Sequence, residues 1–187
     1  SVLTTGATAD TLTVNAGGVG HILLVPYYSA QNGNATLINL VNSDTSNGKE
    51  VKIRFRGASN SDDVLDFTLY MSPGDVWAAK VYKGDDGRAA LITGDKSCTM
   101  PFNVSIPFKT GRLPAAYTTA QKAAETLEGY VEILNTANIP KALQPGQSNV
   151  GGTVTVNPLW TNIKHVSGAA PCSPAASATL TALASTD

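Results

Sequence analysis

Apolar and polar residues alternate along much of the first half of the chain. In "KEVKIRFRG", residues 49 to 57, the side chains of Val51, Ile53 and Phe55 point to one face while basic side chains point to the other. The segment "LDFTLYM", residues 65 to 71, alternates in the same way. Because the turn-forming stretch "GASNSDD" lies between the two segments, they predict a β-hairpin with one buried face.

Further segments of the first half show the same strand pattern, namely "GHILLVPYYSA", "NATLINLVNS", "VWAAKVY" and "AALIT". Pro26 lies inside the first of them and has no backbone N–H to donate, so this strand is expected at a sheet edge or at a bulge. Short strands with turns between them predict a mainly β fold, a β-sandwich of immunoglobulin-like or jelly-roll type with at most one short helix.

The second half is less regular. Helix-forming residues in "TTAQKAAETL", with Thr118 or Thr119 as the N-cap, predict one short helix. The segments "GYVEILN" and "GTVTVN" return to the strand pattern. We therefore predict a single β-sandwich domain over residues 20–172. It is preceded by an N-terminal extension, residues 1–19, that can exchange a strand, and followed by an Ala/Ser/Thr-rich tail, residues 173–187.

Few residues of the chain are charged, and the charges nearly balance. Asp, Glu, Lys and Arg make up 14% of the sequence, against about 25% in ordinary soluble domains. The net charge of −1 creates no field that would attract nucleic acid. No apolar run approaches the roughly 18 residues that span a bilayer, so no membrane span is expected. A surface with so few charges suits a protein that packs against copies of itself.

The start of the chain and its two cysteines indicate export. The chain begins at Ser1 without a methionine, which predicts a mature protein whose signal peptide has been cleaved. Cys98 and Cys172 lie in turn-like contexts, "KSCTMP" and "APCSPA", and an even number of cysteines in an exported protein favours a disulfide. Two unrelated buried thiols are the alternative. The expected location is extracellular, at the cell surface.

Acidic residues cluster in the loop of the predicted hairpin. The candidate calcium ligands are Asn60, Asp62, Asp63 and Asp66. They lack the EF-hand spacing and its closing glutamate, so we expect a solvated turn, with calcium as the alternative.

Lys52, Arg54 and Arg56 form a basic row on one strand face. Aromatic residues are not interleaved with them, as they are in nucleic-acid binding surfaces. We expect these cations to meet carboxylates on neighbouring strands, such as Asp66 or Glu132.

Aromatic, histidine and serine residues are further candidates for a binding or catalytic site. The aromatic side chains of Tyr27, Tyr28 and Trp160 are candidates for binding a cell-surface glycan, although burial in the core is the favoured explanation of aromatic residues in strands. Neither His21 nor His165 belongs to a recognisable catalytic motif, and no serine lies in a Gly-x-Ser-x-Gly elbow. We therefore expect no enzyme activity, no cofactor and no metal centre.

The stretch "NGNATLINLVNSDTSNGKEVKIRFRGASNSDDVLDFTLYMSPGDVW" resembles a group of secreted cell-surface proteins of Gram-negative bacteria. The resemblance is strongest from Gly20 to Met100 and continues through "EGYVEIL" and "IKHVSGAAPC". The strand "VKIRF", followed by a strand that ends in a Pro-Gly turn, is also similar to bacterial immunoglobulin-like modules. These resemblances imply a structural role at the cell surface, and they add no catalytic residue.

We therefore expect an extracellular structural protein that joins copies of itself into a surface layer or filament by β-strand addition. The segment "TLTVN" is the expected assembly strand, with Leu12 and Val14 filling a groove on the neighbour. The alternative is a carbohydrate- or surface-ligand-binding β-sandwich module.

Overall fold

The computed structural model describes residues 13–142 and 156–172. Within these ranges the chain forms eight strands and two short helices. In chain order they are β1 (Ile22–Ser29), β2 (Thr36–Val41), β3 (Gly48–Gly57), β4 (Asp63–Met71), β5 (Val76–Lys83), β6 (Ala89–Ile92), β7 (Cys98–Met100), α1 (Thr119–Ala124), β8 (Glu128–Ile139) and α2 (Pro158–Ile163).

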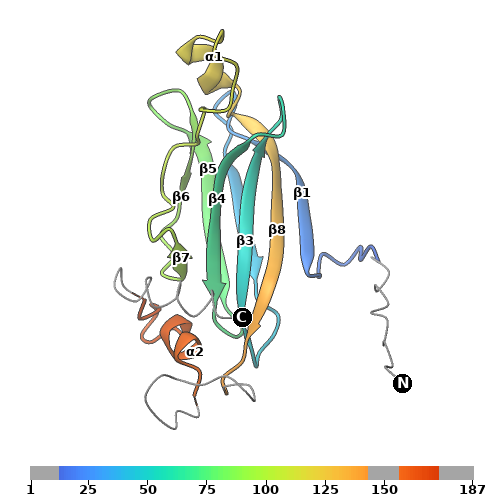
Figure 1. The fold of residues 1–187 in the computed structure, drawn as a ribbon, viewed down its shortest axis with the longest axis vertical. Helices are drawn as coiled ribbons and strands as arrows, with labels where there is room; N and C mark the ends of the chain where they lie inside the picture. The colour runs from blue at the N-terminus through green and yellow to red at the C-terminus, as the bar shows by residue number, and fades with distance from the viewer. Residues whose placement is uncertain (1–12, 143–155, 173–187) are drawn as a thin grey trace, which may run out of the picture.

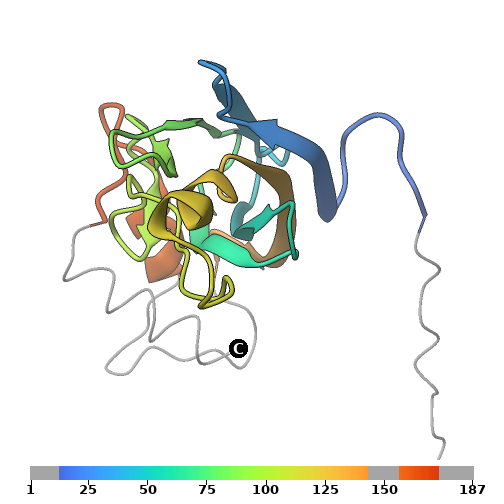
Figure 2. The same cartoon turned by 90° about the horizontal axis from the view of Figure 1, so that it is seen from above.

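The strands form two sheets of unequal width that face each other (Figures 1 and 2). The five-stranded sheet has the order β1-β8-β3-β4-β7, and the three-stranded sheet has the order β2-β5-β6. All of these strand pairs are antiparallel. Side chains from both sheets share one apolar core, which includes Phe55, Phe67, Trp77 and Val81. The prediction of a mainly β, two-layered fold is confirmed.

The predicted hairpin is present as β3 and β4. Val51, Ile53 and Phe55 are buried, as the alternation requires. On the opposite face of β3, the Lys52 ammonium pairs with the Asp66 carboxylate on β4, and Arg56 Nε lies 3.1 Å from Glu132 Oε2 on β8. The expected cross-strand ion pairs are therefore formed by Lys52 and Arg56, whereas Arg54 Nε is buried without a hydrogen-bond partner among the described residues.

Pro26 has both effects that its missing N–H predicts. β1 is the edge strand of the five-stranded sheet, and its register with β8 shifts between Val25 and Tyr28. At this bulge the Tyr28 ring packs against β8 at Gly129, where a side chain would leave the ring no room. The chain uses a glycine here because two neighbouring strands and a buried ring come together.

The helix predicted in "TTAQKAAETL" is α1. Thr118 is its N-cap, and Thr118 and Gln121 form a reciprocal capping box. The second helix, α2, and the short strand β7 were not expected. α2 starts from the Asn157 cap with Pro158 at its first position, and it buries Leu159 and Ile163. Most of the strand predicted in "GTVTVN" lies outside the described residues.

Replacing Gly129 by alanine is expected to destabilise the fold. The added Cβ would lie 1.9 Å from the Arg56 carbonyl oxygen and 2.8 Å from the Tyr28 ring. Overpacking typically costs 1 to 3 kcal/mol, so we expect the free energy of unfolding to fall by about 3 kcal/mol. Gly111→Ala is the control, because no atom of the described residues lies within 4 Å of a Cβ built there. Urea unfolding measures both variants, and equal stability of the two would contradict this account.

Candidate functional site

One border of the sandwich is open. β1 and β2 follow each other in the chain but belong to different sheets. Among the described residues, β1 pairs only with β8 and β2 only with β5, so each strand keeps one free edge. The strands are tied together at one end, where Ser29 N donates to Thr36 Oγ1 at 2.9 Å and Thr36 Oγ1 donates to Ser29 O at 3.0 Å. Towards the other end a groove opens between them.

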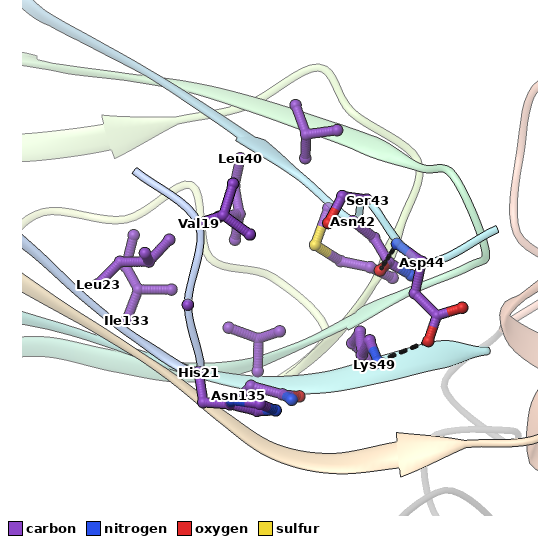
Figure 3. Close-up of a pocket in the computed structure, with 14 residues that line it drawn as sticks. Val19, His21, Leu23, Leu40, Asn42, Ser43, Asp44, Lys49, Ile133 and Asn135 are labelled. Carbon is purple, nitrogen blue, oxygen red and sulfur yellow. Dashed lines mark hydrogen bonds and ion pairs between the residues drawn. The ribbon is translucent and has the colours of Figure 1, made fainter. Parts of the chain in front are cut away.

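The groove is a cavity of about 220 Å³ with an apolar floor and a polar rim (Figure 3). The floor is formed by side chains from both sheets, namely Leu23, Leu40, Val51, Met71 and Ile133. The rim carries His21, Asn42, Asp44, Lys49 and Asn135. An apolar floor beneath unpaired strand edges can accept a strand whose side chains alternate between apolar and polar.

The rim of the groove is fixed by hydrogen bonds around Asp44. Its carboxylate accepts from Lys49 Nζ at 2.8 Å and from the backbone N–H groups of Ser46 and Asn47 at 2.9 Å each. The hydrogen bonds from Lys49 and Asn47 hold the pKa of Asp44 well below its usual value. Lys49 Nζ also donates to Asn138 Oδ1 at 2.6 Å, which ties the rim to β8. The mouth of the groove is therefore already shaped before anything binds.

The chain ahead of β1 runs away from the sandwich (Figures 1 and 2). Residues 13–20 are exposed throughout, and the Val14 side chain, one half of the expected assembly strand, is 98% exposed. Leu12, the other half, lies outside the described residues. Because it is exposed, the Val14 side chain is free to contact a neighbouring molecule.

The opposite border of the sandwich is covered at β6. The segment that follows β7 turns back over this edge, where Leu91 N donates to Ile106 O at 3.1 Å and Phe108 N donates to Ala89 O at 2.8 Å. Phe108 is fully buried in the core. The two borders of the sandwich therefore differ, because this one is closed by the chain itself and the other is not.

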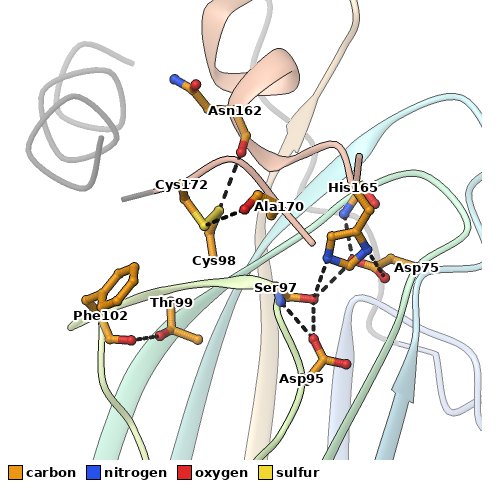
Figure 4. Close-up of a disulfide and its surroundings, with 11 residues drawn as sticks. Asp75, Asp95, Ser97, Cys98, Thr99, Phe102, Asn162, His165, Ala170 and Cys172 are labelled. Carbon is orange, nitrogen blue, oxygen red and sulfur yellow. Dashed lines mark hydrogen bonds and ion pairs between the residues drawn. A yellow bond between two sulfur atoms is a disulfide. The ribbon is translucent and has the colours of Figure 1, made fainter. Parts of the chain in front are cut away.

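The disulfide predicted between Cys98 and Cys172 is present (Figure 4). The two Cα atoms are 5.8 Å apart, and the bridge closes a separation of 74 residues. It attaches the segment after α2 to the first residue of β7. Disulfides persist mainly in oxidising compartments, which fits an exported protein.

Ser97, His165 and Asp75 meet close to the disulfide (Figure 4). His165 Nδ1 lies 3.3 Å from Asp75 Oδ1, and His165 Nε2 lies 3.5 Å from Ser97 Oγ. The contacts are those of a Ser-His-Asp set, in which the imidazole accepts the serine proton. Here Ser97 Oγ instead donates to Asp95 Oδ1 at 2.6 Å, and it also lies 3.3 Å from Asp75 Oδ2. Two carboxylates compete with the imidazole for one proton, which does not favour nucleophilic catalysis.

We call these three residues, with Asp95, the polar clamp. Asp75 lies in the turn between β4 and β5, Ser97 precedes β7, and His165 follows α2. The Asp75 carboxylate also accepts from Ser72 N at 3.1 Å and from Val76 N at 2.9 Å. The clamp therefore joins three segments that are distant in sequence. Only the "SPGD" turn signals part of it in the sequence, because the partners of Asp75 are set by the fold.

Three of the four candidate calcium ligands, Asn60, Asp62 and Asp66, contact different partners, whereas Asp63 Oδ1 is buried without a hydrogen-bond partner in the part of the chain that the structure describes. Asn60 Oδ1 accepts from Asp62 N at 3.0 Å, which is the turn contact expected of asparagine. Asp62 Oδ1 lies 3.7 Å from Arg112 Nη1, and Asp66 pairs with Lys52, which lowers the pKa of Asp66. Asp63 is opposite Arg56 in the hairpin register. Within the described ranges, no group of three His, Cys, Asp or Glu side chains is placed to hold a metal ion.

The three candidate glycan-binding aromatics do not form one site. Tyr28 is fully buried, and its hydroxyl donates to Thr126 O at 3.1 Å, so its ring has no face for a ligand. Burial, and secondarily the charge of Glu128, raises the pKa of the Tyr28 phenol. Tyr27 is exposed and its hydroxyl donates to Glu128 at the start of β8, at the α1 end of the sandwich. Trp160 lies on α2 at the other end, with Lys141 Nζ and Lys164 Nζ 5.5 and 4.8 Å from its ring centroid.

Comparisons with protein-family models, curated proteins and solved structures found no match for this chain. The resemblance to bacterial surface proteins therefore stays a prediction. In the part of the chain that the structure describes, neither helix is long or apolar enough to cross a membrane.

Replacing His165 by alanine is expected to loosen the polar clamp. The change removes the imidazole from the Asp75 carboxylate, whose side chain is only 6% exposed. The Asp75 carboxylate keeps its hydrogen bonds from Ser72 N and Val76 N, so only the net contribution of one contact is lost, and we expect the free energy of unfolding to fall by about 1 kcal/mol. His21→Ala is the control, since His21 is exposed. Urea unfolding under non-reducing conditions tests this, and an unchanged His165→Ala midpoint would contradict the clamp.

Proposed function

We propose that this chain is an extracellular structural protein that assembles with copies of itself, into a surface layer or filament, by β-strand addition between subunits. The observation that carries the proposal is the groove between β1 and β2, which combines two free strand edges with an apolar floor. The sequence ahead of β1, "TLTVN", alternates in the way expected of a strand that such a groove accepts, and its Val14 side chain is exposed.

Strand addition suits this border on energetic grounds. Each free edge presents backbone N–H and C=O groups that an added strand would pair with. Four of the five floor residues are already buried within the chain, so the apolar area that would be removed from water comes mainly from the added strand, at about 25 cal/mol for each Å² buried. Both gains are lost when the border stays open to solvent.

The composition and the disulfide support the same function. With 14% charged residues, the surface sets up little repulsion between copies of the chain. The Cys98–Cys172 bridge fits a protein that works outside the reducing cytoplasm. Export with a cleaved signal peptide and residence at the cell surface are parts of this proposal, and the function needs no cofactor.

The alternative, a carbohydrate-binding module, receives less support from the geometry. Tyr27 and Trp160 lie at opposite ends of the sandwich, and Tyr28 is in the core. The Trp160 ring has two lysine ammonium groups close to it. A sugar platform requires an aromatic face that is free to stack.

The purified chain is expected to form polymers as its concentration rises. Light scattering should show mass increasing with concentration, and negative-stain microscopy should show a layer or filament with a regular repeat. The control is a full-length chain in which residues 1–16 are replaced by a Gly-Ser sequence of equal length, which we expect to remain monomeric. Monodisperse monomers of the original chain at every concentration, salt and divalent-ion condition would contradict the proposed function.

A further inference from the structure

We infer that residues 11–16 of one copy enter the β1–β2 groove of the next copy and pair with the free edge of β2. The inference rests on the proposed function and specifies which segment of one copy contacts which strand of the next. Leu12 and Val14 would face the groove floor, and the three-stranded sheet would gain a fourth strand.

Of the two free strand edges, that of β2 is better suited to pair with an added strand. Its six residues pair with β5 in continuous register from Thr36 to Val41. β1 contains Pro26, which cannot donate a hydrogen bond, and its register breaks at a bulge beside that proline. An added strand can therefore form an uninterrupted ladder with β2 but not with β1.

The segment has the length and pattern that the groove requires. Residues 11–16 read "TLTVNA", so Leu12, Val14 and Ala16 share one strand face while Thr11, Thr13 and Asn15 share the other. Six extended residues span about 20 Å, the length of β2. None of them is charged, so placing the segment over an apolar floor removes no ion from water.

The residues after the segment connect it to β1 through a glycine-containing turn. Gly17 and Gly18 come next, and Gly18 has a φ of +71°, which only glycine adopts at little cost. Val19 and Gly20 then line the mouth of the groove on the same molecule. Residues 11–16 can therefore extend away from their own sandwich, while Val19 and Gly20 stay at the mouth of that sandwich's groove.

A neighbouring copy fits as the source of the strand better than the same chain does. Only residues 17–21 separate the segment from β1, so folding back would place it in a hairpin beside β1, on the edge that Pro26 interrupts. The described part of the segment instead points away from its own sandwich (Figures 1 and 2). Donation from each copy to the next is a head-to-tail contact, which builds open filaments when its rotation does not close a ring.

Disulfide trapping between two separately purified variants tests where the segment docks. One carries Val14→Cys, and the other carries Leu40→Cys, which lies on β2 and lines the groove. The native cysteines are bonded to each other, so the described residues offer no competing thiol. The control partner is Leu37→Cys, which is on β2 but 72% exposed on the opposite face. After mixing and mild oxidation, we expect the yield of the cross-link between position 14 of one chain and position 40 of another to exceed the yield of the cross-link to position 37 at least tenfold.

The outcomes separate this inference from the proposed function. Polymers without the 14–40 cross-link would leave strand addition standing and overturn the docking site. A double variant, Val14→Cys with Leu23→Cys, tests whether the segment binds its own chain. An intramolecular disulfide between the two positions at high dilution, with no disulfide between chains, would overturn the neighbouring copy as the source of the strand. Absence of any polymer from the original chain would overturn both.

A second experiment on the full chain tests which face of the segment meets the groove floor, and it does not depend on oxidation. Leu12→Asp with Val14→Asp places charges on the face that meets the groove floor, and we expect the concentration needed for assembly to rise at least tenfold. Thr11→Asp with Thr13→Asp adds the same charge on the opposite face and should change it much less. Equal effects of the two pairs would overturn the inferred orientation.

Discussion

The two sheets share one apolar layer although one has five strands and the other three. Sheets of unequal width cannot cover each other at both borders, so the layer has to be closed by something other than strand pairing. At the β6 border the chain closes it with the segment that carries Phe108. At the β1–β2 border the described residues supply no such cover, and apolar side chains from both sheets line an open groove.

The proposed self-assembly rests on this difference between the borders. A border that is closed by its own chain has no reason to bind a neighbour, whereas free strand edges over an apolar floor are stabilised by any strand that fits. The sequence directly ahead of β1, "TLTVNA", also has the alternation of a strand and is joined to β1 through two glycines. In the proposed assembly, an acceptor and a donor at different places on one molecule would give a head-to-tail contact that repeats from copy to copy.

Alternation in the sequence was enough to predict the strands β1 to β6 and β8, because each of them buries one face more than the other, whereas the three-residue β7 is too short to show a pattern. It placed Val51, Ile53 and Phe55 in the core, and the proline rule placed β1 at an edge. The groove and the polar clamp could not be predicted from the sequence, since their residues come from segments that meet only in the folded chain, over long sequence separations. The helix α2 was missed for the same reason, because six residues become helical only when Leu159 and Ile163 are buried against β4 and β8.

The polar clamp and the groove are connected through Asn42, which lies on the groove rim and is itself buried. Its backbone N–H donates to Asp75 O at 2.9 Å, and its side-chain amide donates to Ser72 O at 2.9 Å. Asp75 is held in turn by His165, in the segment that the disulfide fastens to β7. The rim is therefore ordered by covalent and polar contacts away from the groove. A groove whose shape is fixed in advance loses less conformational entropy when a strand enters it, so more of the gain from burial and pairing remains as affinity.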